Sequence, residues 1–148
     1  MKQLLAALCL ALACTATSAR APTDQQAVDM AERGAALIKA KGKREMMERI
    51  HAKDPQFVQA GVSLTMRDTY TATLIADPTN PSLVGSTDAD GVFPGSGKHA
   101  RDVIDLAQRA NTGWLDSVYR DPSGRSARKK TYIRSVGDVV LEAGIYQP

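Results

Sequence analysis

The chain has 148 residues and a formal net charge of +3, with 24% charged residues dispersed along the sequence. A positive balance this weak does not favour nucleic acid as a partner. The two cysteines, Cys9 and Cys14, both lie near the N-terminus, so the rest of the chain has no disulfide, no thiol nucleophile and no cysteine-based metal site.

Residues 1–19 have the layout of a secretory signal peptide. One positive charge at Lys2 precedes an apolar run of about ten residues, half the length that spans a bilayer, and small residues end the segment at Ala19. We therefore expect cleavage after Ala19 and a periplasmic or secreted product, residues 20–148, without a transmembrane segment. A lipoprotein acylated on Cys14 is the disfavoured alternative, because alanine stands three residues earlier, where leucine is normally needed.

Two helices are predicted to follow. Thr23 and Gln26 have the spacing of a capping box, in which each side chain bonds the backbone of the other. Apolar residues then recur at helical spacing as far as Gly42, which supplies a C-terminal stop. A second, shorter helix is expected over about 43–53, ended by Pro55 because the residue before a proline is pushed out of the helical region.

The apolar spacing then changes to the alternation that is typical of β-strands. A long loop over 77–97, rich in proline and glycine, has a length that in small domains tends to be functional, and a helix over 98–110 follows it. Five strands are expected, at about 62–66, 70–76, 114–119, 130–136 and 139–146. The sequence therefore predicts an α+β fold, a five-stranded antiparallel sheet with a long N-terminal helix and further helices packed on one face.

The sequence offers few groups for catalysis. His51 and His99, the two histidines, lie in polar helical stretches without a second histidine or cysteine at i+3 or i+4, which indicates surface positions. Asp88-Ala-Asp90-Gly91 begins like a calcium loop, but no acidic residue follows where the closing bidentate glutamate is required, so we interpret it as a turn. We expect no enzymatic activity, no cofactor and no metal.

Aromatic and basic residues gather between 113 and 148, which holds the single tryptophan and three of the four tyrosines. Alternate residues of a strand face opposite sides, so one of the neighbouring cations Lys129 and Lys130 should point away from the helices. A cation beside tyrosine hydroxyls can hold a small carboxylate, with Trp114 and Tyr119 as an apolar wall. The alternatives are a solvated basic cluster and a tryptophan that belongs to the core.

Eight short motifs follow one another along the chain: Ala76-Asp77-Pro78, Asn80-Pro81, Leu83-Val84-Gly85, Asp88-Ala-Asp90-Gly91, Gly113-Trp114, Asp121-Pro122, Lys129 with Tyr132, and Gly144-Ile-Tyr146. Each is weak alone, but the ordered set resembles a single Cache domain of the second type. This family comprises PAS-like extracytoplasmic sensor modules of bacterial chemoreceptors and histidine kinases, and the resemblance covers the chain from about residue 27 to 146.

The resemblance implies a pocket for a small molecule, often a short carboxylate, lined here by Lys129, Tyr132, Trp114, Tyr119 and Asp77. It also implies that Lys129 is the charge partner of a ligand carboxylate. Asp77 stands where the family has histidine, and its negative charge would oppose an anion held there. Since Lys129 and Tyr132 lie on opposite faces of an ideal strand, both reach one cavity only if a bulge intervenes or Lys129 precedes the strand.

Two functions of different classes follow from these observations. The favoured one is a free-standing periplasmic domain that binds a small organic acid or related metabolite, with a membrane receptor or kinase as its partner. The alternative is a non-catalytic accessory or interaction module of a membrane signalling or transport system, whose pocket is filled by side chains.

Overall fold

The computed structural model describes residues 21–87, 98–120 and 126–147, which form three α-helices, one 3-10 turn and a six-stranded antiparallel sheet. The elements, in chain order, are α1 (Asp24–Lys41), α2 (Lys43–His51), β1 (Val58–Gln59), β2 (Val62–Asp68), β3 (Leu74–Ala76), η1 (Pro81–Leu83), α3 (Lys98–Ala110), β4 (Thr112–Arg120), β5 (Ser126–Val136) and β6 (Val139–Gln147).

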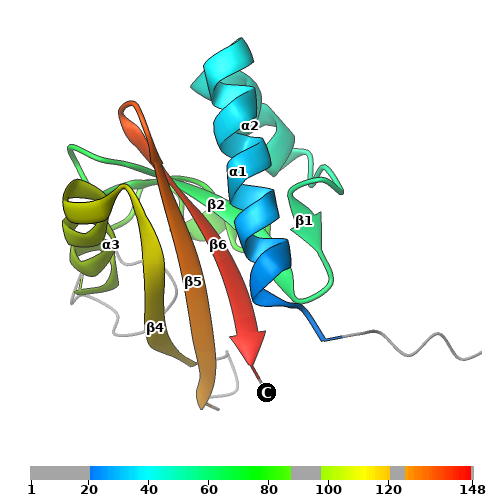
Figure 1. The fold of residues 1–148 in the computed structure, drawn as a ribbon, viewed down its shortest axis with the longest axis vertical. Helices are drawn as coiled ribbons and strands as arrows, with labels where there is room; N and C mark the ends of the chain where they lie inside the picture. Colours follow the sequence, from blue (N-terminus) through cyan, green and yellow to red (C-terminus); the bar gives the residue numbers. More distant parts are fainter. Residues whose placement is uncertain (1–20, 88–97, 121–125, 148) are drawn as a thin grey trace, which may run out of the picture.

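The sheet follows the order β1-β2-β6-β5-β4, and β3 pairs with the far end of β2. Strands β5 and β6 form a long hairpin in the middle of the sheet (Figure 1), closed by the two-residue turn Gly137-Asp138 between Val136 and Val139. Gly137 has φ +59°, a left-handed conformation that glycine adopts without a steric penalty. The predicted turn is thereby confirmed.

The main hydrophobic core lies between one face of the sheet and the helices α1 and α2. We call this face the helix face; α1 crosses it in Figure 1. Its buried side chains alternate along the strands, as Leu64 and Met66 do in β2 and Leu141 and Ala143 do in β6. Gly34 lets α1 approach closely, because a Cβ there would lie 2.9 Å from a methyl carbon of both Leu64 and Leu141. The buried helix residues of this core are Ala27, Met30, Ala31, Ala35, Met46 and Ile50.

A second, smaller hydrophobic cluster lies on the opposite face of the sheet. There α3 packs Val103 and Ala107 against Ile133 of β5 and Val140 of β6, all of them buried. The register places Ile133 opposite Glu142 and Val140 opposite Ser135, so both side chains point away from the helix face. Helix α3 covers only part of this second face.

The predicted α+β, PAS-like architecture is confirmed, and two details of it are corrected. Helices lie on both faces of the sheet, because the apolar stripe of α3 meets Ile133 and Val140 on the side away from α1. The sheet has six strands rather than five, because the two residues of β1 are too few to show an alternating pattern. The capping box of α1 is confirmed: Thr23 accepts from the Gln26 backbone, and the Gln26 side chain accepts from the Thr23 N–H at 2.8 Å.

Candidate functional site: the polar face of the sheet

The face of the sheet away from α1 carries a set of buried polar side chains, which we call the polar face. The register pairs Thr65 with Glu142, and residues directly opposite one another in antiparallel strands share a face. The neighbouring row pairs Thr131 with Gly144. The buried polar residues on this face are Ser63, Thr65 and Arg67 from β2, Lys129 and Thr131 from β5, and Glu142 from β6.

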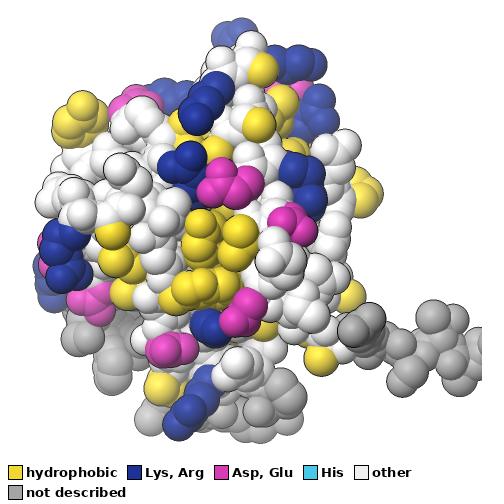
Figure 2. Space-filling view, in the orientation of Figure 1, with side chains coloured by type: hydrophobic (Ala, Val, Ile, Leu, Met, Phe, Trp, Pro, Cys, Tyr) yellow, Lys and Arg dark blue, Asp and Glu magenta, His cyan; other side chains and the backbone are white. Residues whose placement is uncertain are grey.

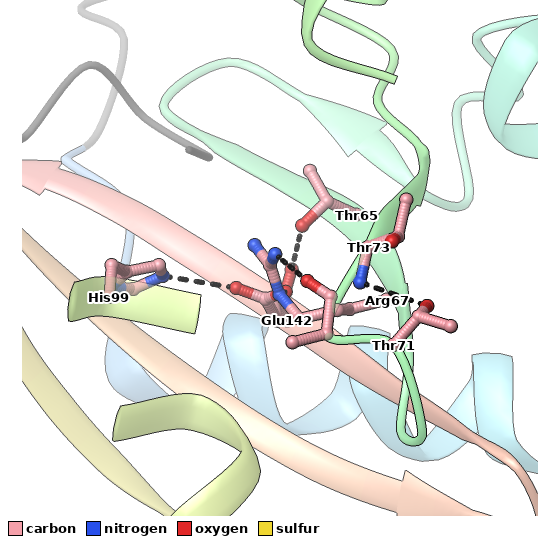
Figure 3. Close-up of polar contacts among 7 residues, drawn as sticks. Thr65, Arg67, Thr71, Thr73, His99 and Glu142 are labelled. Atoms are coloured by element: carbon pink, nitrogen blue, oxygen red, sulfur yellow. Dashed lines mark hydrogen bonds and ion pairs between the residues drawn. The ribbon is translucent and has the colours of Figure 1, made fainter. Parts of the chain in front are cut away.

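Glu142 is held between a cation of β2 and a ring of α3 (Figure 3). Its Oε1 lies 2.7 Å from Arg67 Nε, and its Oε2 lies 3.1 Å from His99 Nε2. The Arg67 and Glu142 side chains are 0% and 2% exposed, so this ion pair is fully removed from water. Arg67 is anchored a second time, because its Nη1 donates to the carbonyl oxygen of Ala72 at 2.7 Å.

The cations around Glu142 keep it ionised. Burial raises the pKa of this carboxyl, but the charge of Arg67, the hydrogen bond and charge of His99 and the charge of Lys129 together hold the pKa well below its usual value. An ionised carboxylate can only accept hydrogen bonds, so His99 Nε2 carries the proton that it shares with Oε2. The network is therefore a carboxylate with one donor each from β2 and α3 and a nearby cation from β5.

Lys129 is buried on the same face, and its side chain extends from β5 across the backbone of β6. Its ammonium lies 5.3 Å from the centroid of the Tyr146 ring, within range of a cation–π contact. A Cβ on Gly144 would collide with the Lys129 stem, so glycine at this position makes room for the lysine. The aliphatic stem thus covers the strand, and the charge stays near Glu142 and Tyr146.

Two buried polar atoms of the polar face have no hydrogen-bond partner among the residues that the structure describes. These are the Nη2 of Arg67 and the hydroxyl of Thr131, whose residues are both 0% exposed. Buried polar groups are nearly always paired with protein or water, and neither atom has such a partner within the described ranges. Both can donate a hydrogen bond, and the hydroxyl can also accept one.

The expectation that Lys129, Tyr132 and Trp114 line one cavity is corrected. Lys129 lies inside β5, and the pairing with β4 and β6 continues past it without a bulge, so Tyr132 faces the opposite side. Tyr132 and Trp114 lie on the helix face, where their ring centroids are 5.2 Å apart and both rings contact the main core. The alternative that Trp114 belongs to the core is the one that the contacts support.

The helix face also carries Lys130, the neighbour of Lys129 in β5. Lys130 lies over the half-buried ring of Trp114 at 4.4 Å and forms an ion pair with Asp24 of α1. Arg134 forms a second ion pair between β5 and α1, 2.9 Å from Glu32. Figure 2 shows hydrophobic side chains at the centre of this side of the molecule, bordered by basic and acidic ones. The cations of this face are thus used to hold α1 against the sheet.

The other two residues predicted for the site lie apart from these. Asp77 is buried after β3, and its Oδ1 accepts from the backbone N–H groups of Thr79 and Asn80 at 2.8 Å each, so it holds its own turn. Tyr119 pairs with Ala127 at the end of β4, and its side chain is outside the described part of the structure. The acidic turn Asp88-Ala-Asp90-Gly91 also lies outside the described residues.

Sequence reasoning missed Arg67, Glu142 and His99 as members of the polar face. His99 was expected at the surface of a polar helix, but it is buried because the start of α3 rests on β6. Arg67 has a signal in the sequence, since it continues the polar alternation of Ser63 and Thr65. Glu142 also has a signal in the sequence, because it is the single charged residue in the apolar strand that follows Asp138.

Several solved structures have a fold similar to this one. No protein-family model and no curated protein matches the sequence. A Cache chemosensory domain, solved to explain its recognition of carboxylic acids, aligns with a TM-score of 0.59 at 17% identity, over 84% of this chain and 88% of its own. A periplasmic sensor domain of a chemotaxis protein aligns with a TM-score of 0.57 at 18% identity, over 84% and 90%.

A methyl-accepting chemotaxis protein from Vibrio parahaemolyticus aligns with a TM-score of 0.56 at 21% identity, over 78% of this chain and 82% of its own. The chain thus has the fold of Cache-type sensor domains. Within the described ranges, no helix is long and apolar enough to cross a membrane. Within the same ranges, no group of three or more histidine, cysteine or acidic residues could hold a metal ion.

Proposed function

We propose that this chain is an extracytoplasmic sensor-type domain that binds a small molecule bearing a carboxylate on the polar face of its sheet. The observation that carries the proposal is the buried polar chemistry of one sheet face in a Cache fold. Lys129 and Arg67 bring positive charge there, and Thr131 adds a hydroxyl without a described partner. The likeness to a domain solved for carboxylic acid recognition supports the choice of ligand class.

In this proposal Lys129 is the charge partner of the ligand carboxylate. Its ammonium lies beside Tyr146, and its stem is fixed by the close passage over Gly144, so the charge is positioned before a ligand arrives. A buried cation paired with an anion forms a charge-assisted hydrogen bond of about twice the strength of a neutral one. The Thr131 hydroxyl, one step along the same face of β5, is the natural second contact.

Export from the cytoplasm is part of the same proposal. The charge, apolar run and small residues of 1–19 support cleavage after Ala19, and the structural neighbours include a periplasmic sensor domain. The intact mass of protein recovered from a periplasmic fraction tests this. A mass that still includes residues 1–19, or one that carries acyl chains on Cys14, contradicts it.

The alternative, a non-catalytic accessory module of a membrane signalling or transport system, is favoured by one observation. Glu142 already supplies a carboxylate to Arg67 and His99, so part of the polar face is occupied by the chain itself. In this alternative the fold serves a membrane receptor or kinase as an interaction surface, and small acids do not bind.

A thermal-shift screen of short monocarboxylates, dicarboxylates, amino acids and amines separates the two functions. A ligand at 100 times its dissociation constant adds about 2.7 kcal/mol to the free energy of unfolding, a clear rise in Tm for a domain of this size. We expect at least one small carboxylate to give such a rise and amines to give none. A flat response to every carboxylate would leave the accessory module as the better account.

A further inference from the structure

The buried carboxylate of Glu142 is bound in the way that a protein binds a small organic anion. One oxygen accepts from Arg67 at 2.7 Å, and the other accepts from His99 at 3.1 Å. Each oxygen has its own charged or polar donor, and the donors come from different elements, β2 and α3. A carboxylate bound by a charged donor forms stronger hydrogen bonds than one bound by neutral donors alone, and Arg67 is such a donor.

The donors do not depend on Glu142 alone for their positions. Arg67 is also fixed by its second bond, from Nη1 to the Ala72 carbonyl. His99 is buried in the first turn of α3, and that helix is held on the sheet by Val103 and Ala107. Removing the Glu142 side chain should therefore leave the two donors near their present places, with a space between them.

We infer that Arg67 and His99 form a carboxylate-binding site of the polar face, and that the chain's own Glu142 is its occupant. Glu142 is then the residue that determines which anions the face accepts. Its negative charge opposes an anionic ligand group at Arg67 and His99, so the ligand contact that we propose is made by Lys129. This last consequence for ligand choice rests on the proposed function, whereas the site itself does not.

Replacement of Glu142 by alanine tests the site with a defined probe. The atoms removed correspond to one acetate ion, so acetate can enter the vacated space and contact both donors. We expect sodium acetate to raise the Tm of Glu142→Ala by about 3 °C or more at roughly ten times its dissociation constant. Sodium chloride at equal ionic strength should give a smaller rise, because chloride has the charge of acetate but neither its second acceptor atom nor its methyl group.

Two controls make the result specific. The wild-type protein should show no acetate-dependent rise in Tm beyond the chloride effect. If acetate also binds at Lys129, the wild-type protein will show a further rise. Adding Lys129→Ala to the wild-type protein and to Glu142→Ala removes that contribution. Glu142→Gln fills the same volume without the charge, so it should not respond to acetate beyond the Lys129 contribution. Equal responses of Glu142→Ala and Glu142→Gln, or no acetate response of Glu142→Ala beyond chloride, would overturn the inference.

If Glu142→Ala is unfolded in chloride, a refolding experiment tests the same inference. Dilution from urea into acetate should recover the native circular dichroism spectrum, and dilution into chloride should not. Failure of acetate to recover it overturns the inference. The outcome is distinct from that of the carboxylate screen: a flat screen of the wild-type protein removes the proposed function, and acetate rescue of Glu142→Ala still establishes the site.

Discussion

The two faces of one sheet have opposite chemistry, and β6 shows the contrast within adjacent residues. Leu141 points to the helix face and packs against α1 next to Gly34. Glu142 points to the polar face and lies between Arg67 and His99. Both side chains are buried, at 0% and 2% exposure, so burial alone does not distinguish them. Their partners do.

The contrast indicates a division of roles between the faces. The helix face gathers nearly continuous apolar contacts with α1 and α2, and its cations form ion pairs that hold α1 to β5. The polar face buries charges and leaves two polar atoms without a described partner, which lowers stability unless something else is gained. The polar face is therefore the one on which we propose that the ligand binds.

The largest effect is expected for Glu142→Gln, which keeps the side-chain volume and removes the charge. Arg67 then remains buried without its counter-ion, at a cost of about 3–5 kcal/mol in the free energy of unfolding at neutral pH. Urea unfolding followed by circular dichroism measures this. A loss below about 1 kcal/mol would mean that the buried ion pair does not stabilise the fold.

The same variant has a characteristic pH dependence. The pKa of Glu142 is lowered in the folded protein, so the stabilisation is present above the unfolded value near 4.5 and is lost as pH falls below it toward the folded value. The stability difference between wild type and Glu142→Gln should therefore be constant from pH 7 to about 5 and shrink at lower pH. A difference that grows on acidification contradicts the assigned charge state.

On the helix face, Leu141→Ala should cost about 2–5 kcal/mol, because it removes buried methyl groups and leaves a cavity beside α1. Unlike Glu142→Gln, this loss should not depend on pH between 4 and 7, since no charge is involved. The affinity of the folded fraction for a ligand should be unchanged. Urea unfolding at several pH values and a ligand titration provide the check.

A pair of glycine substitutions sharpens the comparison at smaller cost. Gly34→Ala places a methyl group 2.9 Å from Leu64 and Leu141, so we expect about 1–3 kcal/mol of destabilisation from overpacking and no change in binding. Gly144→Ala displaces the Lys129 side chain. The free energy of ligand binding should therefore fall by more than the free energy of unfolding does. If both variants change only stability, the polar face has no binding role that depends on the position of Lys129.

Much of the fold could be predicted from the sequence because its signals are local. The capping box of Thr23 and Gln26, the turn at Gly137-Asp138 and the alternation of β2 each depend on neighbouring residues. Strand alternation also predicted that Lys129 and Lys130 face opposite sides, which the register confirms. The motif spacing, by contrast, placed Lys129 and Tyr132 in one cavity, although alternation separates them unless a bulge intervenes, and β5 has none there.

The candidate site was harder to predict because its members meet only through the tertiary fold. Arg67 and Glu142 are 75 residues apart in the sequence, and His99 and Glu142 are 43 apart. No local spacing links three single charged or polar residues at such distances. What the sequence did contain was the anomaly of one glutamate in an apolar strand, which a buried counter-ion explains.

The neighbouring lysines of β5 test the central claim most directly, because they are adjacent in the sequence and lie on opposite faces of the sheet. With a carboxylate found by the screen, isothermal titration calorimetry should show binding to Lys129→Ala weakened by about 2–5 kcal/mol. Lys130→Ala, whose ammonium pairs with Asp24 on the helix face, should bind within about 0.5 kcal/mol of wild type. Unchanged binding by Lys129→Ala, or an equal loss in Lys130→Ala, would contradict the assignment of the polar face as the ligand face.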